Sequence, residues 1–359
     1  MKEDAQALDE VVVIGYGSAT KKDLTGAVSS VGGKTIGERH AANLASAMQG
    51  AMAGVQISRA GGAPESNPTI RVRGITTMGT NDPLVLVDGV PGNLEDVNPN
   101  DVESITVLKD AASAAIYGSQ AAAGVVLVTT KRGKSNEMAI SYNFEYGLSY
   151  FGTHPEQDTV ERYYQKNAER GYNDNPTGDP EEGQNSETIQ NYRKNHAEDP
   201  DNYPMTDWHN AIYKKFAPTQ KHSLVARGGN SKVRTNVTMS YEDFEGQYAN
   251  RNTERIMLRA NNSFSLGKYL GADLDVNFKR QNRETPIFDS DVYVGAWNSP
   301  AVYGDWFSDG RLSIGSNNGT NPMAFLHQGG QRKNWDTTIG GRASLYYKPF
   351  KGLRVTGVV

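Results

Sequence analysis

The chain has 359 residues and a mass of 39.1 kDa, which is enough for two domains. Its 37 Lys and Arg against 41 Asp and Glu give a net charge of −4, so the broad positive field of a non-specific nucleic-acid binder is missing and no nucleic-acid partner is expected. The absence of cysteine excludes disulfides, Cys-based zinc sites and thiol nucleophiles. No apolar run approaches the roughly 18 residues of a membrane helix, but membrane strands need only about 10 residues of alternating polarity, so that class stays open.

The first part of the chain has the pattern of a compact α+β domain. Residues 1–10 are polar and charged and lack the pattern of a signal peptide. Asp110 is placed to cap a helix over residues 111–117 that Gly118 would end. An Ala-rich stretch at 41–52 predicts another helix, and short apolar runs bounded by Gly, Pro and Asn predict strands at 69–72, 84–87, 105–108 and 125–130.

After residue 134 the pattern changes to strict alternation. In residues 138–150 every even position is apolar or aromatic, and every odd position is small or polar. An amphipathic helix does not produce this period of two, so the pattern predicts β-strands. The same alternation, with more exceptions in some, occurs in residues 222–228, 233–241, 256–266, 270–279 and 339–347.

The connections between these strands alternate in length. Residues 151–219 and 282–335 are long, whereas 229–231 and 267–268 are tight turns. All long loops therefore fall at one end of the sheet, as they do in outer-membrane barrels. The strands of a soluble β-sandwich also alternate in polarity, so that fold is the alternative. The last predicted strand begins at Leu353 and runs to the end of the chain. Open strand edges do not persist in hydrocarbon, so we expect an N-terminal piece of a longer protein.

Motifs of catalysis and cofactor binding are near misses. Residues 11–17 form a strand followed by Gly-x-Gly, but Thr20 stands where the third glycine of a dinucleotide fold belongs. Residues 33–35 resemble the end of a phosphate-binding loop without its first glycine. The acidic run 96–101 has Asp101 where a calcium loop needs Gly, so a turn with local caps is expected. The histidines show no metal-ligand spacing. We therefore predict that the protein is not an enzyme, and that it has no catalytic residue, no metal site and no cofactor.

Three stretches resemble one known family. They read DEVVVIGYG at residues 9–17, TIRVRGITTMGTNDPLVLVDGVP at 69–91 and DVESITVLKDAASAAIYGSQAAAGVVLVTTK at 101–131. They resemble the plug of a TonB-dependent outer-membrane transporter, most closely of the SusC/RagA family of the Bacteroidota. The resemblance implies an α+β plug domain followed by antiparallel strands of an incomplete transmembrane β-barrel, because whole plugged barrels of this type have roughly 22 strands.

The resemblance also implies an organisation and a function. Residues 1–19 would be a TonB-box-like segment, residues 20–134 the plug domain, and residues 135–359 the first strands and long outer loops of a truncated barrel. The plug and N-terminal segment would face the periplasm, and the long loops would lie outside the cell. The implied function is TonB-dependent active import of oligosaccharides in the outer membrane, with TonB, a SusD-like surface lipoprotein and outer-membrane lipid as partners. Peptide import and, in another class, a secreted carbohydrate-binding β-sandwich are the alternatives.

The resemblance assigns roles to individual residues. The buried charges of Arg71 and Arg73 are expected to meet carboxylates of the inner barrel wall. Tryptophans in the long loops are candidates for stacking on sugar rings, and they are Trp208, Trp297 and Trp306. The residues that match the TonB-binding segment are Glu10, Val11, Val12, Val13, Ile14 and Gly15. The plug-signature residues are Arg71, Arg73, Gly74, Asp88, Gly89, Pro91, Glu103, Lys109, Asp110, Tyr117, Gly118 and Gly124.

Overall fold

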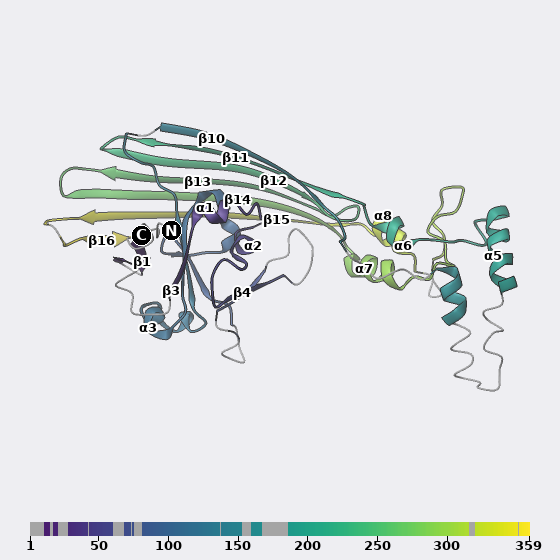
Figure 1. The fold of residues 1–359 in the computed structure, drawn as a ribbon. Coiled ribbons are helices and arrows are strands. Elements are labelled where there is room, and N and C mark those ends of the chain that lie inside the picture. Colours follow the sequence, from purple (N-terminus) through teal and green to yellow (C-terminus); the bar gives the residue numbers. More distant parts are fainter. Residues whose placement is uncertain are drawn as a thin grey trace, which may run out of the picture.

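The structure, a computed structural model, has two parts that lie face to face. An N-terminal α+β unit packs against one face of a long, curved sheet, and several helices lie beyond one end of that sheet (Figure 1). We call the face of the sheet toward the α+β unit its inner face. The described residues are 11–14, 17–20, 28–41, 43–59, 68–72, 74, 81–136, 138–152, 159–166, 186–315, 320–350 and 352–359.

Five strands form the central sheet of the α+β unit, in the spatial order β3, β8, β9, β6, β7. Neighbours are antiparallel except β6 and β9, which are parallel. Two further pairs, β1 with β2 and β4 with β5, are separate. The four strands predicted from short apolar runs are confirmed as β5, β6, β8 and β9. The bounds are β1 (Val11–Ile14), β2 (Gly17–Thr20), β3 (Val28–Gly32), β4 (Val55–Ser58), β5 (Thr69–Val72), β6 (Leu84–Val87), β7 (Val90–Pro91), β8 (Val102–Leu108) and β9 (Val125–Thr130).

Short helices connect these strands, and some of them begin at a side-chain cap. Asn43 accepts a hydrogen bond from the Ser46 N–H and begins α2 (Leu44–Met48), within the predicted stretch. Asp110 caps α3 (Ala111–Ala114) as predicted. The helix is shorter than expected, because the chain continues as the 3₁₀ helix η5 (Ala115–Ala121), in which Gly118 takes a φ of 70°. The other short helices are α1 (Gly33–Gly37), η3 (Leu94–Asp96) and η4 (Pro99–Asp101).

The core of the α+β unit lies between its sheet and the first two helices. Ile36 of α1, Leu44 and Met48 of α2, and Ile105 and Val126 of the sheet are at most 1% exposed and belong to one cluster. Burying a side chain of this size stabilises the fold by about 2 kcal/mol. The α+β unit therefore has its own hydrophobic core.

The curved sheet has seven strands in sequential order, each antiparallel to the next. All the segments with a period of two fall on its strands, so that prediction is confirmed. The strands do not close into a barrel within the described residues. Their bounds are β10 (Met138–Ser149), β11 (Ala217–Gly229), β12 (Val233–Glu245), β13 (Asn252–Ser265), β14 (Leu270–Pro286), β15 (Gln331–Tyr347) and β16 (Val355–Val358).

The long connections lie together at one end of this sheet, as predicted, and the tight turns lie at the other (Figure 1). The β10–β11 connection carries α5 (Ser186–Glu198) and α6 (Trp208–Ile212), and the β14–β15 connection carries α7 (Asp289–Asn298) and α8 (Pro322–His327). These two connections pack on one another around Trp208. No helix in the described part of the chain has the length and apolar character to cross a membrane.

In a sheet of a soluble protein the buried face is apolar and the exposed face polar, and in this sheet the polarity of the two faces is reversed. On β12 the side chains of Asn236, Thr238 and Ser240 face the α+β unit and are at most 2% exposed. The alternate residues Met239 and Tyr241 point away from it and are 53% and 38% exposed. The buried face is therefore polar and the exposed face apolar, which is the arrangement of a strand with lipid on one side.

Candidate functional site

The contact between the α+β unit and the inner face of the sheet is built from charged residues. Arg132 follows β9, and its guanidinium makes a bidentate ion pair with Asp275 of β14, with 2.9 Å from Nη1 to Oδ1 and 2.6 Å from Nη2 to Oδ2. Arg342 of β15 lies 3.1 Å from the same carboxylate. Asp275 is only 5% exposed, so its charge is sheltered from water and depends on these two arginines.

A second ion pair joins a turn of the α+β unit to β13. Asp88 and Gly89 have φ values of 51° and 87° and form the tight turn between β6 and β7, for which Asp-Gly is suited. The Asp88 carboxylate accepts hydrogen bonds from the N–H and the hydroxyl of Thr130, at 2.9 Å and 2.6 Å. It also lies 3.8 Å from Nη1 of Arg259. The turn is thereby held against the sheet.

Two further contacts complete this interface. Lys279 of β14 pairs with Asp96, which ends η3. The Asn261 amide of β13 donates to the Thr130 hydroxyl at 2.7 Å and to the Lys131 carbonyl at 2.9 Å. The expected local cap in this region is present, since Asn98 accepts the Asn100 N–H at 2.8 Å.

Asp101 is the least satisfied charge of the interface. It ends η4, its side chain is 3% exposed, and its Oδ1 has no hydrogen-bond partner among the described residues. Burial raises the pKa of this carboxyl to about 6, and the Thr238 hydroxyl and the charges of Arg259 and Lys131 offset only part of the effect. Asp101 therefore titrates far above the usual range of a carboxyl.

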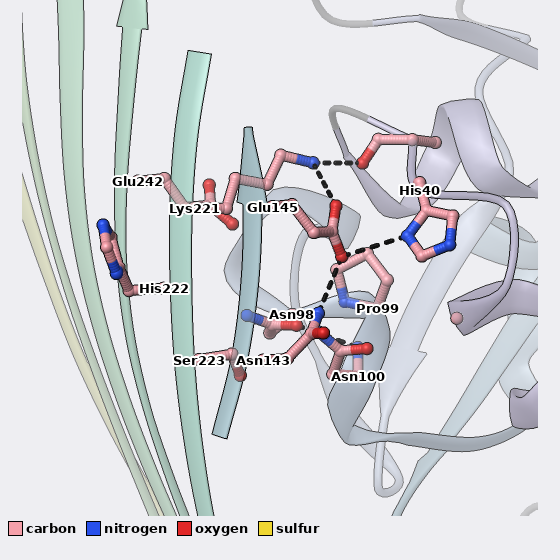
Figure 2. A pocket seen from close by; sticks show the side chains of 12 residues that line it. His40, Asn98, Pro99, Asn100, Asn143, Glu145, Lys221, His222, Ser223 and Glu242 are labelled. Atoms are coloured by element: carbon pink, nitrogen blue, oxygen red, sulfur yellow. Dashed lines mark hydrogen bonds and ion pairs between the residues drawn. The ribbon is translucent and has the colours of Figure 1, made fainter. Parts of the chain in front are cut away.

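Figure 2 shows the contact at the first strands of the sheet, around a cavity of about 20 Å³. The Glu145 carboxylate of β10 lies 3.3 Å from Nδ1 of His40 and 3.9 Å from Nζ of Lys221, and it accepts a hydrogen bond from the Asn143 amide at 2.9 Å. Lys221 also donates to the Ala41 carbonyl at 2.6 Å. A carboxylate of the sheet thus lies between two basic side chains, one from each part of the molecule.

One row of the sheet alternates in charge. Its members stand opposite one another on the five neighbouring strands β10 to β14, and acidic and basic side chains alternate along the first four of these strands. Arg255 lies 3.2 Å from Glu242 and donates from Nε to the Gln281 side chain at 3.0 Å. Most of this row is neutralised within the sheet, whereas Arg259 and Lys279 are neutralised from the α+β unit. Asp275 is neutralised from both. The row consists of Glu145, Lys221, Glu242, Arg255 and Gln281.

Known proteins share this architecture. Residues 20–125 match the TonB-dependent Receptor Plug Domain family. The chain is 33% identical over 285 residues to the TonB-dependent receptor P26 of Formosa agariphila, covering 77% of this chain and 27% of that protein. It is 31% identical over 307 residues to the TonB-dependent receptor SusC of Bacteroides thetaiotaomicron, covering 82% of this chain and 28% of that protein. The RagAB peptide importer in its open-open state has 26% identity and a TM-score of 0.74, covering 97% of this chain and 41% of that one. The chain belongs to the TonB-dependent receptors of the SusC/RagA type.

The fold is also similar to more distant receptors. The siderophore receptor PirA of Acinetobacter baumannii is 15% identical with a TM-score of 0.53, covering 94% of this chain and 39% of that one. The α+β unit is thus the plug of such a receptor, and the curved sheet supplies strands of the surrounding barrel wall. This chain spans less than a third of the length of the two curated relatives described above.

The predicted TonB-binding segment is only partly described. Val11, Val12, Val13 and Ile14 form β1, which pairs with β2 in an antiparallel register from Val11 opposite Thr20 to Ile14 opposite Gly17. Glu10 and Gly15 lie outside the described residues. The strand conformation is the one that pairing with a partner's sheet edge requires.

One expectation for the plug signature stays a prediction. Arg71 pairs with Asp82 of the plug itself at 2.8 Å, and no carboxylate of the described wall strands is paired with it. Contact of Arg71 with other parts of the barrel wall stays a prediction. Arg73 lies outside the described residues. A plug arginine that does bind wall carboxylates is Arg132, which lies 2.6 Å from Asp275 and 3.8 Å from Asp273.

Most other signature residues have contacts within the plug. The Lys109 ammonium donates to the Ser29 hydroxyl and the Ala53 carbonyl. Asp110 caps α3, and Tyr117 packs against the smaller hydrophobic cluster beside β9. Glu103 and Pro91 are exposed. Positive φ values occur at Gly74, Gly89, Gly118 and Gly124.

The tryptophans differ from one another in exposure. Trp208 is fully buried between the two long connections and donates from Nε1 to the Pro300 carbonyl at 3.0 Å, so the expected exposed stacking face is absent. Trp297 is half-buried with its ring 5.1 Å from that of His209. Trp306 is 37% exposed, and its ring centroid lies 5.6 Å from that of His327. Only Trp297 and Trp306 therefore remain candidates for contact with cargo.

Sequence reasoning missed the residues that join plug and wall. Arg259, Lys279 and Asp275 of the wall were not singled out, nor was Arg132. The signal was present, because the wall residues occupy the polar positions of strands with a period of two. A charged side chain at such a position points toward the plug.

Proposed function

We propose that the complete receptor is an active importer of the outer membrane, powered by TonB. The observation that carries the proposal is the reversed polarity of the seven-stranded sheet, whose apolar face is exposed and whose charged face packs on the plug. A sheet of this kind needs lipid outside and a filled, polar interior. In the proposed orientation of the receptor in the outer membrane, the plug faces the periplasm and the two long connections lie outside the cell.

TonB engages the receptor at β1 in this proposal. Residues Val11–Ile14 are β-branched, and β-branched residues suit an extended strand that adds to the sheet edge of a partner. Tension on β1 is transmitted to the plug, whose ion pairs to the wall then have to break before a path opens. Glu10 and Gly15 complete the proposed TonB-binding segment.

The proposed cargo is an oligosaccharide, held between the outer loops and a SusD-like surface lipoprotein. The part-exposed Trp297 and Trp306 support a sugar cargo, because flat aromatic faces stack on sugar rings. A peptide is the second candidate, since the RagAB structure of 26% identity is that of a peptide importer. A secreted β-sandwich finds no support, because the inner face of the sheet packs on the plug and not on a second sheet.

The test uses the full-length receptor in its own host. A strain that lacks the receptor gene is complemented with the wild-type gene, and uptake of labelled oligosaccharide and peptide mixtures is measured with and without TonB. We expect the receptor in the outer-membrane fraction, TonB-dependent uptake, and oligosaccharide in preference to peptide. Recovery of the intact protein in the soluble fraction, or uptake that is equal without TonB, would refute the import proposal. Uptake of peptide alone would refute the proposed cargo.

A further inference from the structure

We infer that Asp101 makes the seating of the plug on the barrel wall sensitive to pH, so that the plug is held more tightly in acid. This goes beyond the proposed import function, because it concerns the contact between plug and wall and holds for any cargo. The contact lies between η4 of the plug and strands β12 and β13 of the sheet.

The hydrogen-bond donors at this contact are unevenly shared between two carboxylates. Asp88 receives two hydrogen bonds from Thr130 and lies 3.8 Å from Arg259. Asp101 is buried beside the same guanidinium, and its Oδ1 receives no hydrogen bond from the described residues. A buried carboxylate without sufficient donors pays a large desolvation cost when it is charged. The geometry therefore makes Asp101 the carboxylate of this contact whose charge is least supported by hydrogen-bond donors.

Every element packed against Asp101 contributes to this balance. The Thr238 hydroxyl of β12 and Arg259 of β13 face it from the wall, and Lys131 and Asp88 face it from the plug. The two basic groups favour the ionised form, whereas burial and the Asp88 charge oppose it. Burial is the largest of these effects, and it raises the pKa of Asp101 to about 6.

The direction of the pH effect follows from this shift. When the plug leaves the wall, Asp101 reaches water and its pKa returns toward the ordinary value of 3.8. Between pH 4 and pH 6 the seated plug holds a proton that the released plug has lost, so seating weakens as the pH rises through this window. Above about pH 7 almost no further weakening comes from this group. We call the equilibrium constant for release of the plug from the wall the opening constant. Linkage predicts that this opening constant is about tenfold larger at pH 7.5 than at pH 5.

Thiol labelling of the full-length receptor in detergent micelles tests this. The reporter is a cysteine introduced at Ser240, whose position on β12 is 2% exposed beneath the plug, so a labelling reagent reaches it only when the plug leaves the wall. Opening constants are obtained from the protection against labelling, after correction for the intrinsic pH dependence of the thiol reaction. We expect the wild type to show the tenfold change between pH 5 and pH 7.5, and Asp101→Asn to show none.

Two further variants separate titration from structural damage. Asp82→Asn changes an exposed plug carboxyl and is expected to keep the tenfold change. Thr238→Val removes a hydroxyl that lowers the pKa of Asp101, so the midpoint of the pH response should move upward even if Asp101→Asn fails to fold. Equal opening of the wild type at both pH values would overturn the inference. So would an undiminished pH response in Asp101→Asn, or an unmoved midpoint in Thr238→Val.

Discussion

Arg132 and Asp275 form the most complete ion pair between plug and wall, with both carboxylate oxygens bound by one guanidinium. Arg132 lies only six residues before β10 begins at Met138, so the pair holds the plug where the chain enters the wall. A plug that moves under tension would separate most readily where such pairs are few. The strength of this one contact therefore bears on how the plug opens.

Removing the guanidinium should loosen the plug. We expect Arg132→Gln to destabilise plug seating by about 2 kcal/mol, because it leaves the buried Asp275 carboxylate with Arg342 as its remaining partner. Arg132→Lys should recover only part of the loss, since an ammonium cannot form the bidentate pair. Urea unfolding of the plug in the full-length receptor measures both effects.

An ion pair on the surface of the outer loops provides the matched control for Arg132→Gln. Arg311 and Asp309 also form an ion pair, with Nε and Nη2 of the guanidinium both 2.7 Å from one carboxylate oxygen, but their side chains are 77% and 50% exposed. Arg311→Gln should leave the urea midpoint unchanged, because solvent and salt screen an exposed pair. An Arg132→Gln midpoint equal to that of the wild type would mean that this pair does not hold the plug.

Two glycines of the plug signature should respond differently to alanine. At Gly124 the φ is +99°, and a Cβ would lie 3.1 Å from Val72 and 3.2 Å from the Leu108 carbonyl. At Gly118 the φ is +70°, and a Cβ would meet no atom within 4 Å. Gly118→Ala should cost about 2 kcal/mol of backbone strain, because its φ of 70° and ψ of −157° lie in a region that residues with a Cβ disfavour, and Gly124→Ala about 4 kcal/mol because overpacking is added.

Thermal unfolding of the two variants side by side gives the comparison. The order of the two transition temperatures is the critical result, with Gly124→Ala below Gly118→Ala and both below the wild type. A Gly118→Ala variant that melts lowest would contradict the packing described around Gly124.

The outer loops offer a similar pair of tryptophans. Trp208 is buried against Val292 and Met323 from the other long connection, so Trp208→Ala should destabilise the folded loops by about 4 kcal/mol. Trp306 is part-exposed, and Trp306→Ala should leave loop stability nearly unchanged. Proteolysis of the outer loops on intact cells measures stability, and binding of labelled oligosaccharide measures contact with cargo.

Loss of sugar binding in Trp306→Ala, with loops that still resist protease, would support stacking on cargo. Unchanged sugar binding would remove Trp306 from the cargo site. Loops of Trp208→Ala that resist protease as well as those of the wild type would contradict the buried role of Trp208.

The seven-stranded sheet could be predicted from sequence because its signal is local. Alternation within each strand, as between Met239 and Ser240, depends only on which face a residue occupies. The caps at Asn43 and Asp110 are local for the same reason. These features need no knowledge of the rest of the molecule.

The plug–wall contacts and the loop core could not be predicted in the same way. The partner of Arg132 depends on the register of β14, and 143 residues separate the two in the chain. Trp208 was expected to be exposed because it lies in a long loop, yet a second loop distant in sequence packs against it. Single-sequence patterns contain no information about such pairings, although charges on the inner positions do mark where a partner is required.

The last prediction concerns energy coupling through β1. Val13→Pro in the full-length receptor removes one backbone donor and restricts the chain within the segment proposed to pair with TonB. Uptake should fall toward that of a strain without TonB, because strand addition depends on backbone hydrogen bonds. Binding of cargo at the cell surface should be unchanged, since the outer loops lie at the far end of the receptor from β1 (Figure 1).

Val13→Ala is the matched control, because it keeps the backbone N–H and shortens only the side chain. We expect it to retain most of the uptake, so that the difference between the two variants isolates the backbone. A Val13→Pro receptor that loses folding and surface binding together with uptake would make β1 a structural strand of the plug, held by its pairing with β2. Undiminished uptake would place the TonB contact elsewhere in the chain. Loss of uptake in both variants would assign the contact to the Val13 side chain and not to strand addition.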